Sequence, residues 1–201
     1  MKIFFHFSVI GFSNTYLIGN DKGDAILIDP GHMDLQLLEL IENNHYYIRH
    51  ILLTHRHPSH TAGIGTLLKI YDADIYSYSP FGDHAMSCYS LSNNEVIELS
   101  GLKIECLHVP GHSSDSLVYI IDKAMFTGDV LLSGRVGETD SKLSHSLIMR
   151  SIKDKLLPLD DRMIIFPGHG APSTLKIENM FNEDLLHEMR VHTHEENEEL
   201  L

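Results

Sequence analysis

Cysteine is scarce in this chain. Its 201 residues include only Cys88 and Cys106, which are far apart in sequence and form no C-x-x-C pair. This excludes a disulfide-stapled scaffold and a zinc site made of thiolates. A low cysteine content is also typical of a reducing compartment, so we expect a cytoplasmic protein.

Basic residues are also few. The chain has 15 Lys and Arg against 28 Asp and Glu, which gives a formal net charge of −13. Binding to nucleic acids and to anionic membrane surfaces depends on clusters of basic residues, so we expect neither partner. No apolar run is long enough to cross a bilayer. We therefore expect a small-molecule substrate as the partner, and the oligomeric state stays open.

The chain does contain many short apolar runs separated by turns. Hydrophobic residues make up 43 % of it, enough for a substantial core. The patterns predict helices over residues 34–43, about 59–71 with Ser59 as N-cap, and 144–156. We expect one α/β domain over residues 1–201, with 177–201 as a short, solvated helical tail. Strands are predicted at residues 3–9, 15–19, 25–28, 48–53, 75–78, 95–99, 102–109, 117–121, 124–127 and 163–166.

Histidine is the outlier of the composition, with 15 residues, as many as Lys and Arg together. Several potential metal ligands come directly after predicted strands. In α/β sheets, ligands and catalytic groups gather beyond the carboxyl ends of the strands, so we expect these side chains to meet. They are His55 and His57, His112, Asp129, and His169. His60 is a further candidate ligand. His187, His192 and His194 are interpreted as part of the tail, and the remaining histidines as ordinary residues.

These residue types suit a zinc centre. Imidazole nitrogens bind Zn²⁺ at about 2.0–2.1 Å. Residues two apart in extended chain point the same way, so His55 and His57 can share one ion with His112. The carboxylate of Asp129 can bridge two ions about 3.5–4 Å apart. We predict one or two zinc ions, with iron or manganese as alternatives, held by His55, His57, His60, His112, Asp129 and His169.

The motifs resemble those of the metallo-β-lactamase superfamily. T-H-R-H-P-S-H at residues 54–60 is similar to its H-x-H-x-D-H motif, and G-H-S at 111–113, F-T-G-D at 126–129 and P-G-H-G at 167–170 resemble its later metal motifs in order. Asp29 resembles the family's buried aspartate. The resemblance implies an α/β fold, a four-layer αββα sandwich, and is greatest to compact glyoxalase-II-like (hydroxyacylglutathione hydrolase-like) enzymes.

Three features depart from the pattern. Ser59 replaces the aspartate that normally ligates the second metal, and Glu138 replaces an arginine in a segment that follows the F-T-G-D motif. The chain also ends soon after the last motif, where full-length glyoxalase II has a helical glutathione-binding domain. On that ground we expect a substrate other than a glutathione thioester.

The resemblance implies a metallo-hydrolase that uses metal-bound hydroxide on a thioester or another activated acyl substrate, with Asp129 and His169 as catalytic residues. One alternative is a mononuclear non-haem iron dioxygenase of the persulfide dioxygenase type, built on two histidines and a carboxylate: His55, His112 and Asp129. Another is a catalytically degenerate metal-binding domain, in which Ser59 marks lost chemistry.

Overall fold

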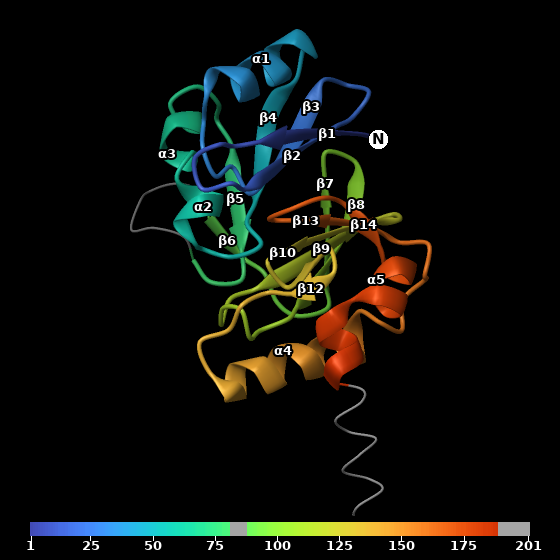
Figure 1. The fold of residues 1–201 in the computed structure, drawn as a ribbon. Helices are drawn as coiled ribbons and strands as arrows, with labels where there is room; N and C mark the ends of the chain where they lie inside the picture. The colour runs from blue at the N-terminus through green and yellow to red at the C-terminus, as the bar shows by residue number, and fades with distance from the viewer. Residues whose placement is uncertain (81–87, 189–201) are drawn as a thin grey trace, which may run out of the picture.

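The computed structural model describes residues 1–80 and 88–188, and two six-stranded sheets form its centre (Figure 1). The first sheet begins as antiparallel hairpins and continues with parallel strands. Its order is β1 (Lys2–Phe7), β2 (Asn14–Gly19), β3 (Asp24–Ile28), β4 (Tyr47–Leu52), β5 (Asp74–Ser77) and β6 (Cys88–Ser90).

The second sheet is antiparallel except where β10 and β13 pair in parallel. Its order is β14 (Ser173–Thr174), β13 (Ile164–Pro167), β10 (Ala124–Gly128), β9 (Leu117–Ile121), β8 (Leu102–His108) and β7 (Glu95–Leu99). A separate small hairpin follows β10 and consists of β11 (Leu131–Leu132) and β12 (Arg135–Val136).

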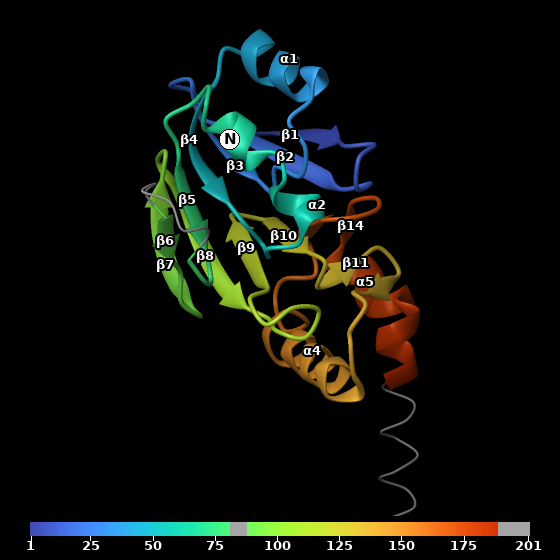
Figure 2. The same cartoon turned by 90° about the vertical axis from the view of Figure 1, so that its left-hand side faces the viewer.

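Helices cover the outer face of each sheet (Figures 1 and 2). On the first sheet lie α1 (Leu35–Asn43), α2 (Pro58–Thr61) and α3 (Ile64–Leu67), and on the second α4 (Lys142–Lys155) and α5 (Leu175–Phe181). The buried residues form three clusters, one between the sheets and one between each sheet and its helices. The predicted four-layer αββα sandwich is confirmed.

Strand periodicity explains the layers. Along β2, Tyr16 and Ile18 pack between the sheets, whereas Leu17 packs under α1 and α3. Along β9, Tyr119 belongs to the cluster between the sheets and Val118 to the cluster under α4. Because side chains alternate across a strand, a strand that is apolar at every position is buried on both faces.

Two local predictions were wrong. The helix expected over residues 59–71 is split into α2 and α3 at Gly63, whose position packs so closely on the carbonyl of Pro30 that a Cβ would lie 2.6 Å from that oxygen. Ser59 is not the N-cap either. Proline suits the first helical position because its φ is fixed, so Pro58 starts α2 and His57 takes the N-cap position.

Residues 177–188 of the predicted tail are helical except at Asn182, and one side of this segment is exposed while the other packs on the domain. Glu178 and Asn182 are fully buried, and Leu185 belongs to the core cluster under the second sheet. His192, His194 and the acidic residues 195–199 lie outside the described residues. Within residues 1–80 and 88–188, no helix is long and apolar enough to cross a membrane.

Candidate metal centre

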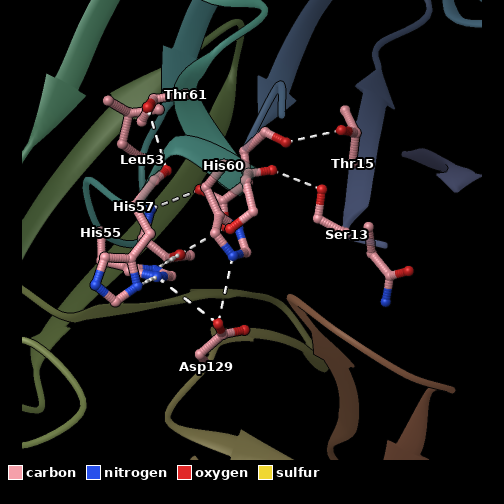
Figure 3. Close-up of polar contacts among 12 residues, drawn as sticks. Ser13, Thr15, Leu53, His55, His57, His60, Thr61 and Asp129 are labelled. Carbon is pink, nitrogen blue, oxygen red and sulfur yellow. Dashed lines mark hydrogen bonds and ion pairs between the residues drawn. The ribbon is translucent and has the colours of Figure 1, made fainter. Parts of the chain in front are cut away.

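The predicted metal ligands meet at one edge of the sandwich. The loop after β4 carries His55 and His57, and the loop after β8 carries His112. Asp129 follows β10 directly, and the loop after β13 carries His169. Figure 3 shows His55 and His60 pointing toward Asp129. The structure therefore brings together side chains that lie up to 114 positions apart, from His55 to His169 (169 − 55).

Three imidazoles and one carboxylate form the first cluster. His57 Nδ1 lies 3.0 Å from His55 Nε2 and 3.0 Å from His112 Nε2. The Asp129 Oδ2 atom lies 3.8 Å from His55 Nε2 and 3.6 Å from His112 Nε2. A tetrahedral zinc ion with bonds of about 2.0–2.1 Å separates its ligands by about 3.3 Å, so the spacing of these four atoms fits one divalent ion.

Hydrogen bonds fix which imidazole nitrogens face this cluster. The carbonyl of Glu138 accepts the Nδ1 proton of His112 at 2.8 Å, which leaves the Nε2 lone pair for a metal. The Thr54 hydroxyl donates to Asp29 Oδ2 at 2.6 Å and therefore accepts the Nδ1 proton of His55 at 3.1 Å. The structure thus sets both histidines in the tautomer that ligates through Nε2.

The second cluster consists of His60, Asp129 and His169. His60 is fully buried and donates from Nδ1 to Asp29 Oδ2 at 3.1 Å. Its Nε2 has no hydrogen-bond partner and lies 3.4 Å from Asp129 Oδ2. A buried, unpartnered nitrogen is costly unless another group binds it, and a cation between His60 and Asp129 would do so.

His169 joins this cluster to a distant loop. Its Nδ1 lies 2.8 Å from Asp129 Oδ1, and its Nε2 lies 3.2 Å from the carbonyl oxygen of Gly11. A carbonyl only accepts, so Nε2 carries a proton and Nδ1 faces the carboxylate. A proton or a cation must therefore lie between His169 Nδ1 and Asp129.

Burial and charge both affect the titration of the centre. Burial lowers the pKa of His55 to about 2, and the neighbouring imidazoles add to this effect, so His55 stays neutral. Burial alone would raise the pKa of Asp129, but the neighbouring His169 and His60 outweigh it and hold the pKa well below the usual range. A neutral His55 beside an ionised Asp129 suits metal binding. Burial would lower the pKa of His60, but Asp29 and Asp129 outweigh it and raise this pKa to about 10, so a metal ion that binds His60 must displace a proton.

Two glycines allow the loops to meet. A Cβ on Gly168 would lie 2.5 Å from Asp129 Oδ1 and 2.6 Å from His60 Cε1. A Cβ on Gly137 would lie 1.6 Å from the Asp129 carbonyl oxygen. These motif glycines are needed because the backbone approaches the ligands more closely than any side chain permits.

The two residues that depart from the family's motifs, Ser59 and Glu138, lie near different clusters. Ser59 lies in α2 next to the second cluster, and its carbonyl accepts a hydrogen bond from Ser13 Oγ at 2.6 Å. Glu138 has an exposed side chain and acts through its carbonyl on His112.

Sequence reasoning missed the β1–β2 loop. Its Gly11 carbonyl contacts His169, and the apolar residues around Gly11 are exposed: Val9, Ile10 and Phe12 are 71 %, 58 % and 69 % exposed. The sequence signal for this loop was a run of apolar residues around Gly11, at a place where the turn of a hairpin is usually polar. The Thr54 hydroxyl was missed as well, because its role depends on Asp29, 25 positions away.

Comparison with known proteins agrees with this geometry. A family model described as the metallo-beta-lactamase superfamily matches residues 9–169. The chain is 31 % identical to hydroxyacylglutathione hydrolase GloC of Haemophilus influenzae, over 84 % of this chain and 91 % of the relative. It is 33 % identical to atrochrysone carboxyl ACP thioesterase of Claviceps purpurea, over 79 % of this chain and 51 % of the relative. The crystal structure of ETHE1 from Myxococcus xanthus matches with a TM-score of 0.81 and 26 % identity, over 94 % of this chain and 90 % of that one.

The chain belongs to the metallo-β-lactamase superfamily. The prediction of a compact metallo-hydrolase of glyoxalase-II-like type is confirmed. The expectation of a substrate other than a glutathione thioester stays a prediction. The donor set fits a divalent ion without selecting zinc, iron or manganese.

Proposed function

We propose that this protein is a metal-dependent thioesterase that hydrolyses small acyl thioesters, and that hydroxyacylglutathione is the first substrate to test. The observation that carries the proposal is the cluster of three imidazoles and one carboxylate, whose spacing fits one divalent ion. Two of the relatives, named as a hydroxyacylglutathione hydrolase and a carboxyl ACP thioesterase, support the choice of thioesters.

Each residue of the centre has a part in this reaction. His55, His57 and His112 would hold the ion. A bound divalent ion lowers the pKa of a coordinated water to about 7 and polarises the scissile carbonyl. Asp129 is ionised and lies within 3.8 Å of His55 and His112, so it can accept a hydrogen bond from the attacking water and orient it. His169 Nδ1 faces Asp129 at 2.8 Å and is placed to take up the proton that the water releases.

The β1–β2 loop supports an acyl substrate. Gly11 ties this loop to His169, and Ser13 ties it to Ser59, so its position relative to the centre is fixed. Apolar side chains exposed beside a polar centre provide a surface for the carbon chain of an acyl group. We propose that Ile10 and Phe12 contact this chain.

We propose that one ion binds tightly at the first cluster and that the second cluster binds weakly. The first cluster has four protein donors. The second has His60, His169 and a share of Asp129, because Ser59 supplies no carboxylate. A neutral hydroxyl is a poor replacement for a carboxylate ligand.

The test is thiol release from hydroxyacylglutathione and from an acyl-pantetheine thioester, by protein loaded with zinc, iron or manganese. The proposal expects metal-dependent release that His57→Ala reduces at least ~100-fold, since removal of a metal ligand removes the catalytic ion. His108→Ala is the matched control, because His108 is an imidazole that belongs to neither cluster. Lack of release with every metal would favour a degenerate metal-binding domain and contradict the proposal.

The iron dioxygenase is the second candidate. His55, His112 and Asp129 lie in the first cluster, and two histidines with one carboxylate form the usual iron site of such oxygenases. The likeness to ETHE1 gives this candidate some weight. The test is oxygen uptake by the iron-loaded protein with a glutathione persulfide. Oxygen uptake without thiol release from thioesters would favour the oxygenase and contradict the hydrolase.

A further inference from the structure

Glu178 is a buried carboxylate far from both ligand clusters. It lies in α5, its side chain is fully buried, and no Lys or Arg is among its hydrogen-bond partners in the described part of the chain. Burial of an ionisable group without a counter-ion costs free energy, so an apolar residue would serve the core better. The hydrogen bonds of Glu178 must therefore explain its presence.

These hydrogen bonds hold the β11–β12 hairpin. Glu178 Oε2 accepts the backbone N–H of Gly134 at 2.9 Å, in the turn between β11 and β12. The same oxygen accepts a hydrogen bond from the Asn182 side-chain amide at 2.7 Å, and Oε1 accepts one from the Ser173 hydroxyl at 2.5 Å. The Asp184 carboxylate accepts the backbone N–H of Val136 at 2.7 Å. Two carboxylates from the C-terminal helical region thus fix residues 134–136.

The residues that follow this hairpin reach the first metal cluster. Gly137 donates its backbone N–H to the Val130 carbonyl at 3.2 Å and lies against the backbone of Asp129. The next residue, Glu138, provides the carbonyl that accepts the Nδ1 proton of His112. Only Gly137 separates the clamped Val136 from that carbonyl. A shift of the hairpin would therefore move the acceptor of His112.

We propose that Glu178, with the help of Asp184, is a positioning residue for His112. It holds residues 134–138 where the Glu138 carbonyl fixes the tautomer and ring orientation of this histidine. The inference rests on His112 being a metal ligand, as in the proposed function. Partners that orient a ligating histidine typically change metal affinity about 10–100-fold when they are lost.

The test is the zinc affinity of the full-length protein, measured by competition with a chromophoric chelator. Glu178→Ala should raise the zinc dissociation constant about tenfold and alter the visible spectrum of the cobalt-loaded protein. Glu178→Gln should stay close to wild type. Its amide oxygen can accept from Gly134 and Asn182, and its NH₂ group can donate to Ser173.

Thr174→Ala is the matched control, because the Thr174 hydroxyl caps α5 by accepting the N–H of Ile177 and touches no part of the hairpin. It should lower the unfolding midpoint and leave the zinc affinity and the cobalt spectrum unchanged. Equal zinc affinity of Glu178→Ala and wild type would overturn the inference. So would an equal loss of affinity in Thr174→Ala, which would show a general effect of α5 stability.

Asp184 keeps the inference testable if Glu178→Ala does not fold. Asp184→Ala should weaken zinc binding, and Asp184→Asn should restore it, because the amide oxygen still accepts the N–H of Val136. Unchanged affinity in Asp184→Ala would count against the positioning role. If the wild-type protein binds neither zinc nor cobalt, the proposed function is refuted. Titration of the wild-type protein alone shows this and separates it from failure of the positioning role.

Discussion

Replacing Thr54 by valine should weaken metal binding at the first cluster. Thr54 is 1 % exposed, and its hydroxyl stands between the Asp29 carboxylate and the Nδ1 proton of His55. Valine has the same shape but puts a methyl group in the place of this hydroxyl. The methyl carbon cannot stay at 2.6 Å from Asp29 Oδ2, because carbon–oxygen contacts begin at about 3.3 Å.

The magnitude follows from the groups that lose a partner. His55 loses the acceptor that keeps its proton on Nδ1, so the tautomer with a proton on Nε2 competes with metal binding. We expect the zinc dissociation constant to rise about 10–100-fold. Asp29 loses a hydrogen bond in a buried site, which should lower the free energy of unfolding of the metal-free protein by about 1.5–3 kcal/mol.

The assay is chelator competition for zinc on the Thr54→Val and Thr54→Ser proteins, with urea unfolding of the metal-free forms. Serine keeps the hydroxyl and loses one methyl group, so its zinc affinity should stay within about threefold of wild type. The reasoning is refuted if valine binds zinc as tightly as wild type. Equal losses in serine and valine would refute it too, because packing rather than the hydroxyl would then be responsible.

Three more changes test other parts of the centre. Ser59→Asp should raise zinc content from about one to about two equivalents per chain by elemental analysis, because a carboxylate would complete the second cluster. Phe12→Ser should raise KM about 3–10-fold for a thioester with a long apolar acyl chain, with kcat unchanged, since it removes apolar contact area; an equal rise for a short acyl chain would contradict this. Gly168→Ala should reduce zinc affinity at least ~10-fold, because its Cβ would lie 2.5 Å from Asp129 Oδ1, and normal affinity would show that the loop relaxes without cost.

The sequence predicted that the candidate ligand side chains meet because strand ends are easy to locate. His55, His112 and His169 each follow an apolar run, and such runs end at predictable edges of an α/β sheet. Glycines beside His112, Asp129 and His169 added a second signal, since the structure confirms close backbone approach at Gly168. Both signals are local in sequence, and for this reason they were readable without the structure.

The orienting groups were not predictable in the same way. The acceptor for His112 is a backbone carbonyl 26 positions later, which any residue type supplies. Gly11 acts on His169 in the same manner across 158 positions. Glu178 looks like an ordinary acidic residue in a polar helix, and only its burial against the β11–β12 hairpin reveals a structural role.

The loss of the family's aspartate at position 59 affects the two clusters unequally. Asp129 is the only residue that the first and second clusters share. The orientation of His55 depends on Thr54, and that of His112 depends on Glu138; neither contact passes through Ser59. The first cluster can therefore keep its full affinity while the second loses a donor. If only the first cluster binds an ion, His60 and His169 can interact with the shared carboxylate instead of a second ion. Both already contact Asp129 in the structure.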